Sequence, residues 1–175
     1  VLINAHDDTG NTRYYQWNYT ETYEYNAVYF SPYIYENGSV HTRQPGEYYY
    51  TCWKTQPSPS ILITSTQQLT EDIVYQYPIT FIPAGSQKLF QRYSILVKQR
   101  AITKEAYAYY KQLKSSTEDL GGLFDPQPGQ ITGNISSVNN PKEVVLGFLN
   151  GSTVYEKRFF IKRSDLPSYL VFYQQ

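Results

Sequence analysis

The sequence is poor in the residues from which catalytic and metal sites are usually built. Its 175 residues contain one cysteine, two histidines and no methionine. Cys52 can form no disulfide within the chain, and a nucleophilic thiol would need a histidine within reach. Because neither His6 nor His41 stands in a motif, we interpret Cys52 as an inert thiol on a strand, or as one whose partner lies outside this chain. We expect no bound metal and no cofactor.

An excess of one charge sign and long apolar runs are also missing. The formal net charge is zero, so we expect no general attraction to nucleic acid or to acidic lipid. The longest apolar run, over residues 144–149, is interrupted by Gly147 and is far shorter than the roughly 18 residues that span a bilayer. No signal peptide is visible. Since the chain begins at Val1 and has no methionine, we expect it to be a soluble piece of a longer protein.

The motifs of common enzyme classes are absent as well. The sequence has no phosphate-binding glycine loop, no zinc-ligand spacing and no nucleophile elbow. Glu21 and Glu24 are carboxylates of the kind that a glycosidase pairs, but residues three apart on a strand point to opposite faces. We therefore predict that the protein is not an enzyme.

Tyrosine is the residue that the sequence has in excess, with 20 copies. It suits strands, because its ring covers a half-wet sheet while its hydroxyl stays hydrated. The alternative is a binding face, since aromatic side chains are enriched at interfaces. The alternating pattern of residues 13–29 predicts a long strand. Its alternate positions are aromatic, apart from Glu21. The candidate binding residues are Tyr15, Trp17, Tyr19, Tyr23, Tyr25 and Tyr33.

Residues 88–135 hold the clearest change from a two-residue to a 3.6-residue hydrophobic period. The predicted elements there are a strand over 89–101, a helix over 103–120 and a turn over 121–130. Thr103 can cap the helix, Glu105 suits its first turn, and Gly121 ends it. The positions that share one helix face are Ala106, Tyr110, Leu113, Thr117 and Leu120. A sheet is the natural surface for this face to pack on.

Short strands separated by turn-forming residues account for most of the remaining chain. Residues 33–46 predict a loop, and Asn150-Gly151-Ser152 predicts a hairpin turn. The other predicted strands cover residues 1–6, 47–54, 60–66, 77–83, 131–138, 144–149, 153–162 and 169–173. We therefore predict a mainly β fold. It would be a single domain over residues 1–175, an antiparallel β-sandwich or barrel-like sheet with one amphipathic helix (103–120) packed on it.

Two polar features allow a second interpretation. Residues 7–11 have turn chemistry, although clustered oxygen ligands would also suit calcium. The segment is too short for a loop of the EF-hand type, which favours the turn. Arg92, Lys98 and Arg100 share one face of the strand over 89–101. Such a basic face is usually solvated, and docking of a partner is the alternative.

Several runs along the chain resemble those of one family. They are Arg13-Tyr-Tyr-Gln-Trp17, Glu21-Thr-Tyr-Glu24, Ile61-Leu-Ile-Thr-Ser-Thr66, Pro78-Ile-Thr-Phe-Ile82 and Arg92-Tyr-Ser-Ile-Leu-Val-Lys-Gln99. The clearest part consists of Ala106-Tyr107, Leu123-Phe-Asp-Pro-Gln-Pro128, Gly133-Asn-Ile135 and Asn140-Pro141. In order and spacing, over nearly the whole chain, these runs are similar to the family catalogued as domain of unknown function 4249, envelope lipoproteins of Bacteroidota.

The resemblance implies an outer-membrane lipoprotein, usually encoded beside a TonB-dependent receptor. It also implies an immunoglobulin-like domain ahead of the present region, and membrane attachment through a lipid anchor that this chain lacks. The family's tail contains a cysteine that would be a partner for Cys52 in the intact protein. The family has no established catalytic residues, so the resemblance supplies no active site.

From the residues and the resemblance together, we predict a non-catalytic accessory or cargo-binding partner of a TonB-dependent outer-membrane transporter in nutrient uptake. Its cargo would be a glycan or a peptide. The contact surface would be the aromatic segment 14–33 with the loop around Asn37. The alternative is a stand-alone carbohydrate-binding or adhesion module.

Overall fold

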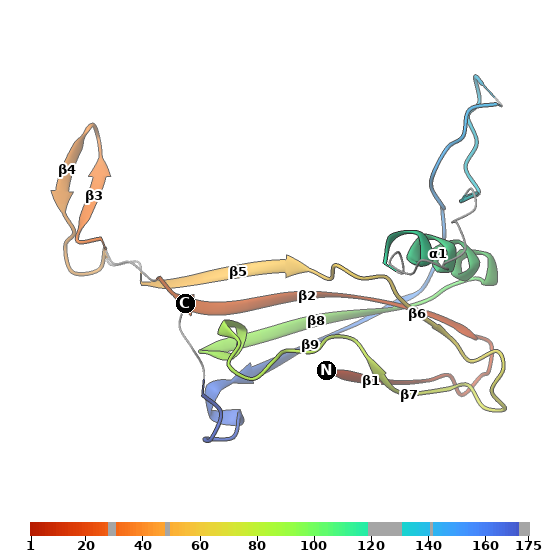
Figure 1. Cartoon of the computed structure of the whole chain (residues 1–175), viewed down its shortest axis with the longest axis horizontal. Coiled ribbons are helices and arrows are strands. Elements are labelled where there is room, and N and C mark those ends of the chain that lie inside the picture. Colours follow the sequence, from red (N-terminus) through yellow and green to blue (C-terminus); the bar gives the residue numbers. More distant parts are fainter. Residues whose placement is uncertain (28–30, 48–49, 119–130, 141, 172–175) are drawn as a thin grey trace, which may run out of the picture. The chain divides into compact units, whose positions relative to one another are not determined.

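The computed structural model describes residues 1–27, 31–47, 50–118, 131–140 and 142–171 (Figure 1). Strands dominate this part of the chain, and one α-helix and two short 3₁₀ helices accompany them. The strands are β1 (Leu2–His6), β2 (Tyr14–Asn26), β3 (Tyr33–Glu36), β4 (Ser39–Thr42), β5 (Thr51–Pro57), β6 (Leu62–Ser65), β7 (Ile73–Pro78), β8 (Arg92–Ala101) and β9 (Val154–Lys162). The helices are α1 (Lys104–Thr117), η1 (Gln87–Leu89) and η2 (Arg163–Asp165).

Within the described ranges, the strands form one five-stranded sheet and two two-stranded sheets. The large sheet has the order β5-β2-β8-β9, and β6 also pairs with β2. β2 is antiparallel to β6 through residues 14–17 and to β5 through residues 20–26. β1 pairs with β7 and β3 with β4, both antiparallel. The predicted mainly β, antiparallel class with one helix is confirmed. The described sheets form no closed barrel and are consistent with a β-sandwich.

The described contacts divide the chain into two compact units, and the single domain over residues 1–175 stays a prediction. Unit 1 consists of Val1–Tyr19, Ser58–Phe81 and Val97–Lys157. Unit 2 consists of Thr20–Pro57, Ile82–Leu96 and Arg158–Gln175. Because the boundaries fall inside β2, β8 and β9, each of these three strands contributes residues to both units.

The core of unit 1 is aromatic. Trp17 is 0% exposed and its ring stacks on those of Tyr15 and Tyr77, with centroids 5.9 and 4.7 Å away. Its indole Nε1 donates a hydrogen bond to Gln99 Oε1 at 3.0 Å, so the one polar atom of the ring is satisfied. The hydroxyl of Tyr15 donates to the buried carboxylate of Asp72 at 2.7 Å, and burial raises the pKa of that hydroxyl.

Helix α1 packs its first turn on the sheet of unit 1. As predicted, Thr103 caps the helix, and its hydroxyl accepts a hydrogen bond from the Ala106 amide at 3.2 Å. Ala106 is fully buried in a cluster with Ile63 and Ile102. The 14 residues of α1 are joined to the sheet mainly there. Within the described residues, no helix combines the length and the apolar character that crossing a membrane requires.

The predicted helix face is only partly covered. Tyr110 and Leu113 are half-buried, whereas Thr117 is exposed. The predicted last position, Leu120, and the predicted turn over 121–130 lie outside the described residues.

Unit 2 contains a hairpin where the sequence predicted a loop over 33–46. Strands β3 and β4 pair directly, and Asn37 and Gly38 connect them with φ angles of 51° and 82°. This is the two-residue connection with positive φ at both positions that asparagine and glycine favour. The prediction took the Asn-Gly pair as a breaker within a loop, but it is the turn of a short ladder.

Several predicted strands begin or end elsewhere. The strand predicted over 77–83 is mostly wrong, because β7 covers Ile73–Pro78 and overlaps the prediction only at residues 77–78. The strand predicted from residue 89 begins at Arg92, because Ser86 caps the short helix η1 that holds Leu89. The strand predicted over 47–54 is β5, shifted to residues 51–57, and residues 48–49 lie outside the described ranges.

The strands predicted over 131–138 and 144–149 are wrong, and so is the hairpin turn after them. These stretches are irregular, and β9 begins only at Val154. Asn134 explains the difference, since its side-chain amide replaces a strand ladder: Nδ2 donates to the Leu149 carbonyl at 2.8 Å and Oδ1 accepts from the Leu149 amide at 2.7 Å. Residues 169–171 are also not a strand, and residues 172–173 lie outside the described part.

The turn predicted over residues 7–11 is confirmed. The Asp7 carboxylate accepts hydrogen bonds from the hydroxyl and the amide of Thr9 and from the amide of Thr12, at 2.6–3.0 Å. These bonds, led by the one from the Thr9 hydroxyl, lower the pKa of Asp7 to about 2. The carboxylate therefore serves the turn itself, as aspartate does in this kind of turn.

Candidate functional site

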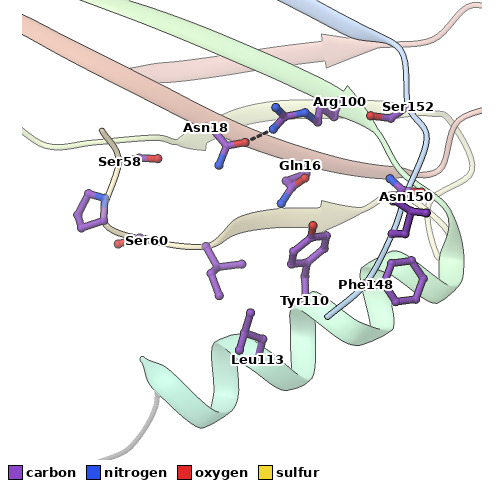
Figure 2. Close-up of a pocket in the computed structure, with 13 residues that line it drawn as sticks. Gln16, Asn18, Ser58, Ser60, Arg100, Tyr110, Leu113, Phe148, Asn150 and Ser152 are labelled. Carbon is purple, nitrogen blue, oxygen red and sulfur yellow. Dashed lines mark hydrogen bonds between the residues drawn. The ribbon is translucent and has the colours of Figure 1, made fainter. Parts of the chain in front are cut away.

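Unit 1 contains a pocket with a volume of about 550 Å³, between its sheet and helix α1 (Figure 2). That volume lies in the range of sites for small molecules. The lining residues are Gln16, Asn18, Ser58, Pro59, Ser60, Ile61, Arg100, Tyr110, Leu113, Phe148, Leu149, Asn150 and Ser152.

Strand alternation places the first wall of the pocket. Gln16 and Asn18 of β2 line the pocket, while Trp17 between them turns into the aromatic core. Arg100 on β8 lies beside Asn18 and donates a hydrogen bond to its side-chain oxygen (Figure 2). Ser58 is fixed against β2, because its amide donates to the Tyr19 carbonyl at 2.8 Å and its hydroxyl accepts from the Tyr19 amide at 3.3 Å.

The helix and an irregular segment supply the other walls. Tyr110 and Leu113, one turn apart on α1, rise toward the sheet (Figure 2). Phe148 packs its ring on that of Tyr109, with centroids 5.3 Å apart. The hydrogen bonds between Asn134 and Leu149 hold this segment in place. The pocket therefore combines amides, hydroxyls and a guanidinium with two aromatic rings.

The described lining of the pocket carries one positive charge. Arg100 is the only charged side chain among the described lining residues. A carboxylate does bond to one lining residue, since Glu118 Oε1 accepts a hydrogen bond from the Ile61 amide at 2.5 Å. Its other oxygen is 3.9 Å from the ammonium of Lys114, so the charge of Glu118 is already shared within the helix end.

Most of the aromatic residues predicted to bind a partner are in the interior instead. Tyr15, Trp17, Tyr19 and Tyr23 are all less than 9% exposed. Their side chains form the core face of β2, which the alternating pattern predicts as readily as a binding face. In this structure those four side chains do not form a contact surface.

The two remaining candidates differ from those four. Tyr25 is half-buried and packs its ring near that of Tyr23, at 6.1 Å. Tyr33 at the start of β3 is 57% exposed. Binding through Tyr33 and the adjacent hairpin stays a prediction.

The two lining residues on β2 were missed because they occupy the opposite parity to its aromatic residues. Gln16 and Asn18 alternate with the aromatic residues, and a polar alternate face is ordinarily solvent-facing. Arg100 belongs to the predicted basic face, so one member of that face was singled out by sequence. No local sequence pattern indicates that Phe148 and Asn150 line the pocket, because their position depends on how the irregular segment folds back.

Glu21 and Glu24 form ion pairs with different cations. This agrees with their spacing on a strand, which predicts that they point to opposite faces. Glu21 contacts the ammonium of Lys88 at 2.6 Å, and Glu24 contacts the guanidinium of Arg92 at 2.5 Å. Neither residue lines the pocket. The two carboxylates are therefore parts of separate ion pairs in unit 2.

Comparison with known proteins places the chain in a family. No curated protein matches it. No solved structure matches it either. One family does match, over residues 1–158, which is most of the 175-residue chain. The protein belongs to the family described as Domain of unknown function (DUF4249).

Proposed function

We propose that this chain is the non-catalytic, cargo-binding part of a cell-envelope lipoprotein that serves a TonB-dependent transporter of the outer membrane. The observation that carries the proposal is the pocket of unit 1, which has the size of a small-molecule site and a wall of convergent polar groups. The sequence resemblance to envelope lipoproteins supports the placement in the outer membrane through a lipid anchor.

The chemistry of the pocket supports binding without catalysis. Its described lining contains serines but no histidine, cysteine, aspartate or glutamate. A serine hydroxyl is a weak nucleophile unless an adjacent general base activates it. Among these serines, the hydroxyl of Ser58 already accepts a hydrogen bond from the Tyr19 amide. The groups present can orient a ligand by hydrogen bonds and ring contacts.

The transporter partnership is tested by native co-purification. The tagged full-length lipoprotein would be extracted from its own outer membrane, and the proteins that accompany it would be identified by mass spectrometry. We expect a TonB-dependent receptor in stoichiometric amount. Recovery of the lipoprotein alone would contradict the partnership.

A stand-alone carbohydrate-binding module is the second candidate, and the rings of Tyr110 and Phe148 favour it. Aromatic faces combined with side-chain amides, such as those of Gln16 and Asn150, suit a hydroxylated ring. In that case Tyr110→Ala abolishes binding on a glycan array with no receptor present. Tyr155→Ala is the matched control, because Tyr155 is 67% exposed on β9 and lies outside the pocket lining.

A further inference from the structure

The three basic residues on one face of β8 have different partners. The Arg92 guanidinium is 2.5 Å from a Glu24 carboxylate oxygen, and the Lys98 ammonium is 3.1 Å from one of Glu156. Arg100 donates instead to the neutral side-chain amide of Asn18. Among the described residues, no carboxylate lies within ion-pair distance of Arg100. Among the residues that the structure describes, two cations of this face thus have a carboxylate partner, and the third has none.

The uncompensated cation is the one that lines the pocket. Arg100 is half-buried there, and a guanidinium has five N–H donors of which Asn18 uses only a part. Guanidinium groups bind carboxylates and similar oxyanions in two-point geometry. A positive charge in a partly closed pocket, with no counter-ion among the described side chains, fits a ligand that brings the negative charge.

The rest of the lining indicates what carries that charge. Gln16 and Asn150 offer amides, Ser60 and Ser152 offer hydroxyls, and Tyr110 adds a ring face. These groups both donate and accept hydrogen bonds, as sugar hydroxyls do. A purely apolar anion would leave these polar groups unpaired, at a cost in affinity.

We propose that the pocket binds an acidic sugar, whose carboxylate or sulfate is held by Arg100 and whose hydroxylated ring lies among the amides and Tyr110. The inference rests on the proposed cargo-binding function and names its ligand class. The anion is the shared chemistry, and a carboxylate from a uronic acid and a sulfate from a sulfated sugar are its two sources.

The test is isothermal titration calorimetry on the full 175-residue chain with four probes. They are trigalacturonic acid, its neutral methyl ester, galactose 6-sulfate and galactose. We expect each charged sugar to bind at least about tenfold more tightly than its neutral counterpart, the size of effect that a charge-assisted hydrogen bond gives. The stronger of the two charged probes identifies the source. Added salt should reduce this preference, since Arg100 is only half-buried.

Two variants distinguish a local effect of Arg100 in the pocket from the general electrostatic field of the basic face. Arg100→Gln removes the cation and keeps an amide that can reach Asn18, and we expect it to abolish the preference for the charged probes. Lys98→Gln removes the same charge two residues away, outside the pocket lining, and should leave the preference unchanged. Circular dichroism of both variants checks that the fold is intact.

Other outcomes overturn the inference in distinguishable ways. Equal binding of the acid and its ester, with no effect of Arg100→Gln, would overturn the acidic ligand and leave cargo binding standing. Equal weakening by Lys98→Gln and Arg100→Gln would assign the preference to the general field and overturn the role of Arg100. If none of the four probes binds, the sugar ligand is overturned, and receptor co-purification decides the proposed function separately.

Discussion

Glu21 is a carboxylate within a row of aromatic residues, and it is 2% exposed. Its two oxygens accept hydrogen bonds from Gln56 at 3.0 Å, from Lys88 at 2.6 Å and from Tyr93 at 2.7 Å. Burial alone would raise the pKa of Glu21. The hydrogen bonds and the charge of Lys88 outweigh burial and hold the pKa below 4.5. The exception in the aromatic pattern is thus a satisfied ion pair, not a reactive acid.

Glu21→Gln is expected to destabilise the protein. The variant leaves the Lys88 ammonium without its counter-ion and disturbs the bond from Tyr93, which should cost about 3 kcal/mol of unfolding free energy. The measurement is urea denaturation followed by circular dichroism. Glu156→Gln is the control, because that side chain is 55% exposed in its pair with Lys98 and should change stability by less than about 1 kcal/mol.

The same ion pair makes part of the stability depend on pH. Because the folded pKa of Glu21 lies below the ordinary 4.5, the folded state binds fewer protons than the unfolded state in this range. The contribution is therefore fully present above pH 4.5 and is lost as pH falls through the lowered folded pKa. We expect the stability difference between wild type and Glu21→Gln to shrink below pH 4.5. A difference that stays constant down to pH 2 would contradict the assignment.

At the same scale, the sequence allowed the alternation of β2 to be predicted but not the function of each face. Tyr15 and Trp17 share a parity, and that is what the structure shows. Which parity faces the interior depends on the helix and strands that cover it. Trp17 is buried with its indole N–H satisfied by Gln99, and Gln16 and Asn18 line the pocket.

At the scale of elements, the start of α1 is the feature that sequence predicted best. Thr103→Ala removes the hydroxyl that accepts from the Ala106 amide and should lower the unfolding free energy by about 1 kcal/mol. Ser115→Ala is a suitable control, since Ser115 is an exposed residue within the same helix and alanine favours helix at least as well. Thermal denaturation of the two variants compares them. Equal melting temperatures would rule out a stabilising cap.

The segment from 131 to 153 is the element that sequence could not predict. Its apolar runs have the composition of strands, yet the side chain of Asn134 occupies the backbone groups of Leu149. Gly133 passes so close to the Gly147 carbonyl that a Cβ would lie 1.6 Å from its oxygen. Only the folded-back chain brings these residues together, so a pattern of neighbouring residues carries no sign of them.

Asn134→Ala should loosen the segment and weaken the pocket with it. Losing the paired hydrogen bonds to Leu149 costs about 1 to 2 kcal/mol locally, and Phe148 and Asn150 lie on either side of Leu149. We expect faster amide hydrogen exchange at Leu149 and weaker binding of any pocket ligand. Asn139→Ala, in the same segment, should change neither. Unaltered exchange at Leu149 in the Asn134 variant would show that the amide is not the anchor.

At the scale of the whole molecule, the two compact units share β2, β8 and β9. Each of these strands runs from one unit into the other without a break in the backbone. We therefore expect one cooperative unfolding transition, with calorimetric and van't Hoff enthalpies that agree. Two resolved transitions in the calorimeter would mean that the units unfold independently.

The two tryptophans of the sequence fall one in each unit, in opposite surroundings. Trp17 in unit 1 is fully enclosed, whereas Trp53 in unit 2 is 55% exposed, with the Arg92 guanidinium 5.5 Å from its ring centroid. The protein thus has a pair of built-in optical reporters. Acrylamide should quench the red-shifted fluorescence of Trp53 at once and reach the blue-shifted emission of Trp17 only when unit 1 opens. The emission wavelength of the unlabelled protein can therefore distinguish the surroundings of Trp53 from those of Trp17.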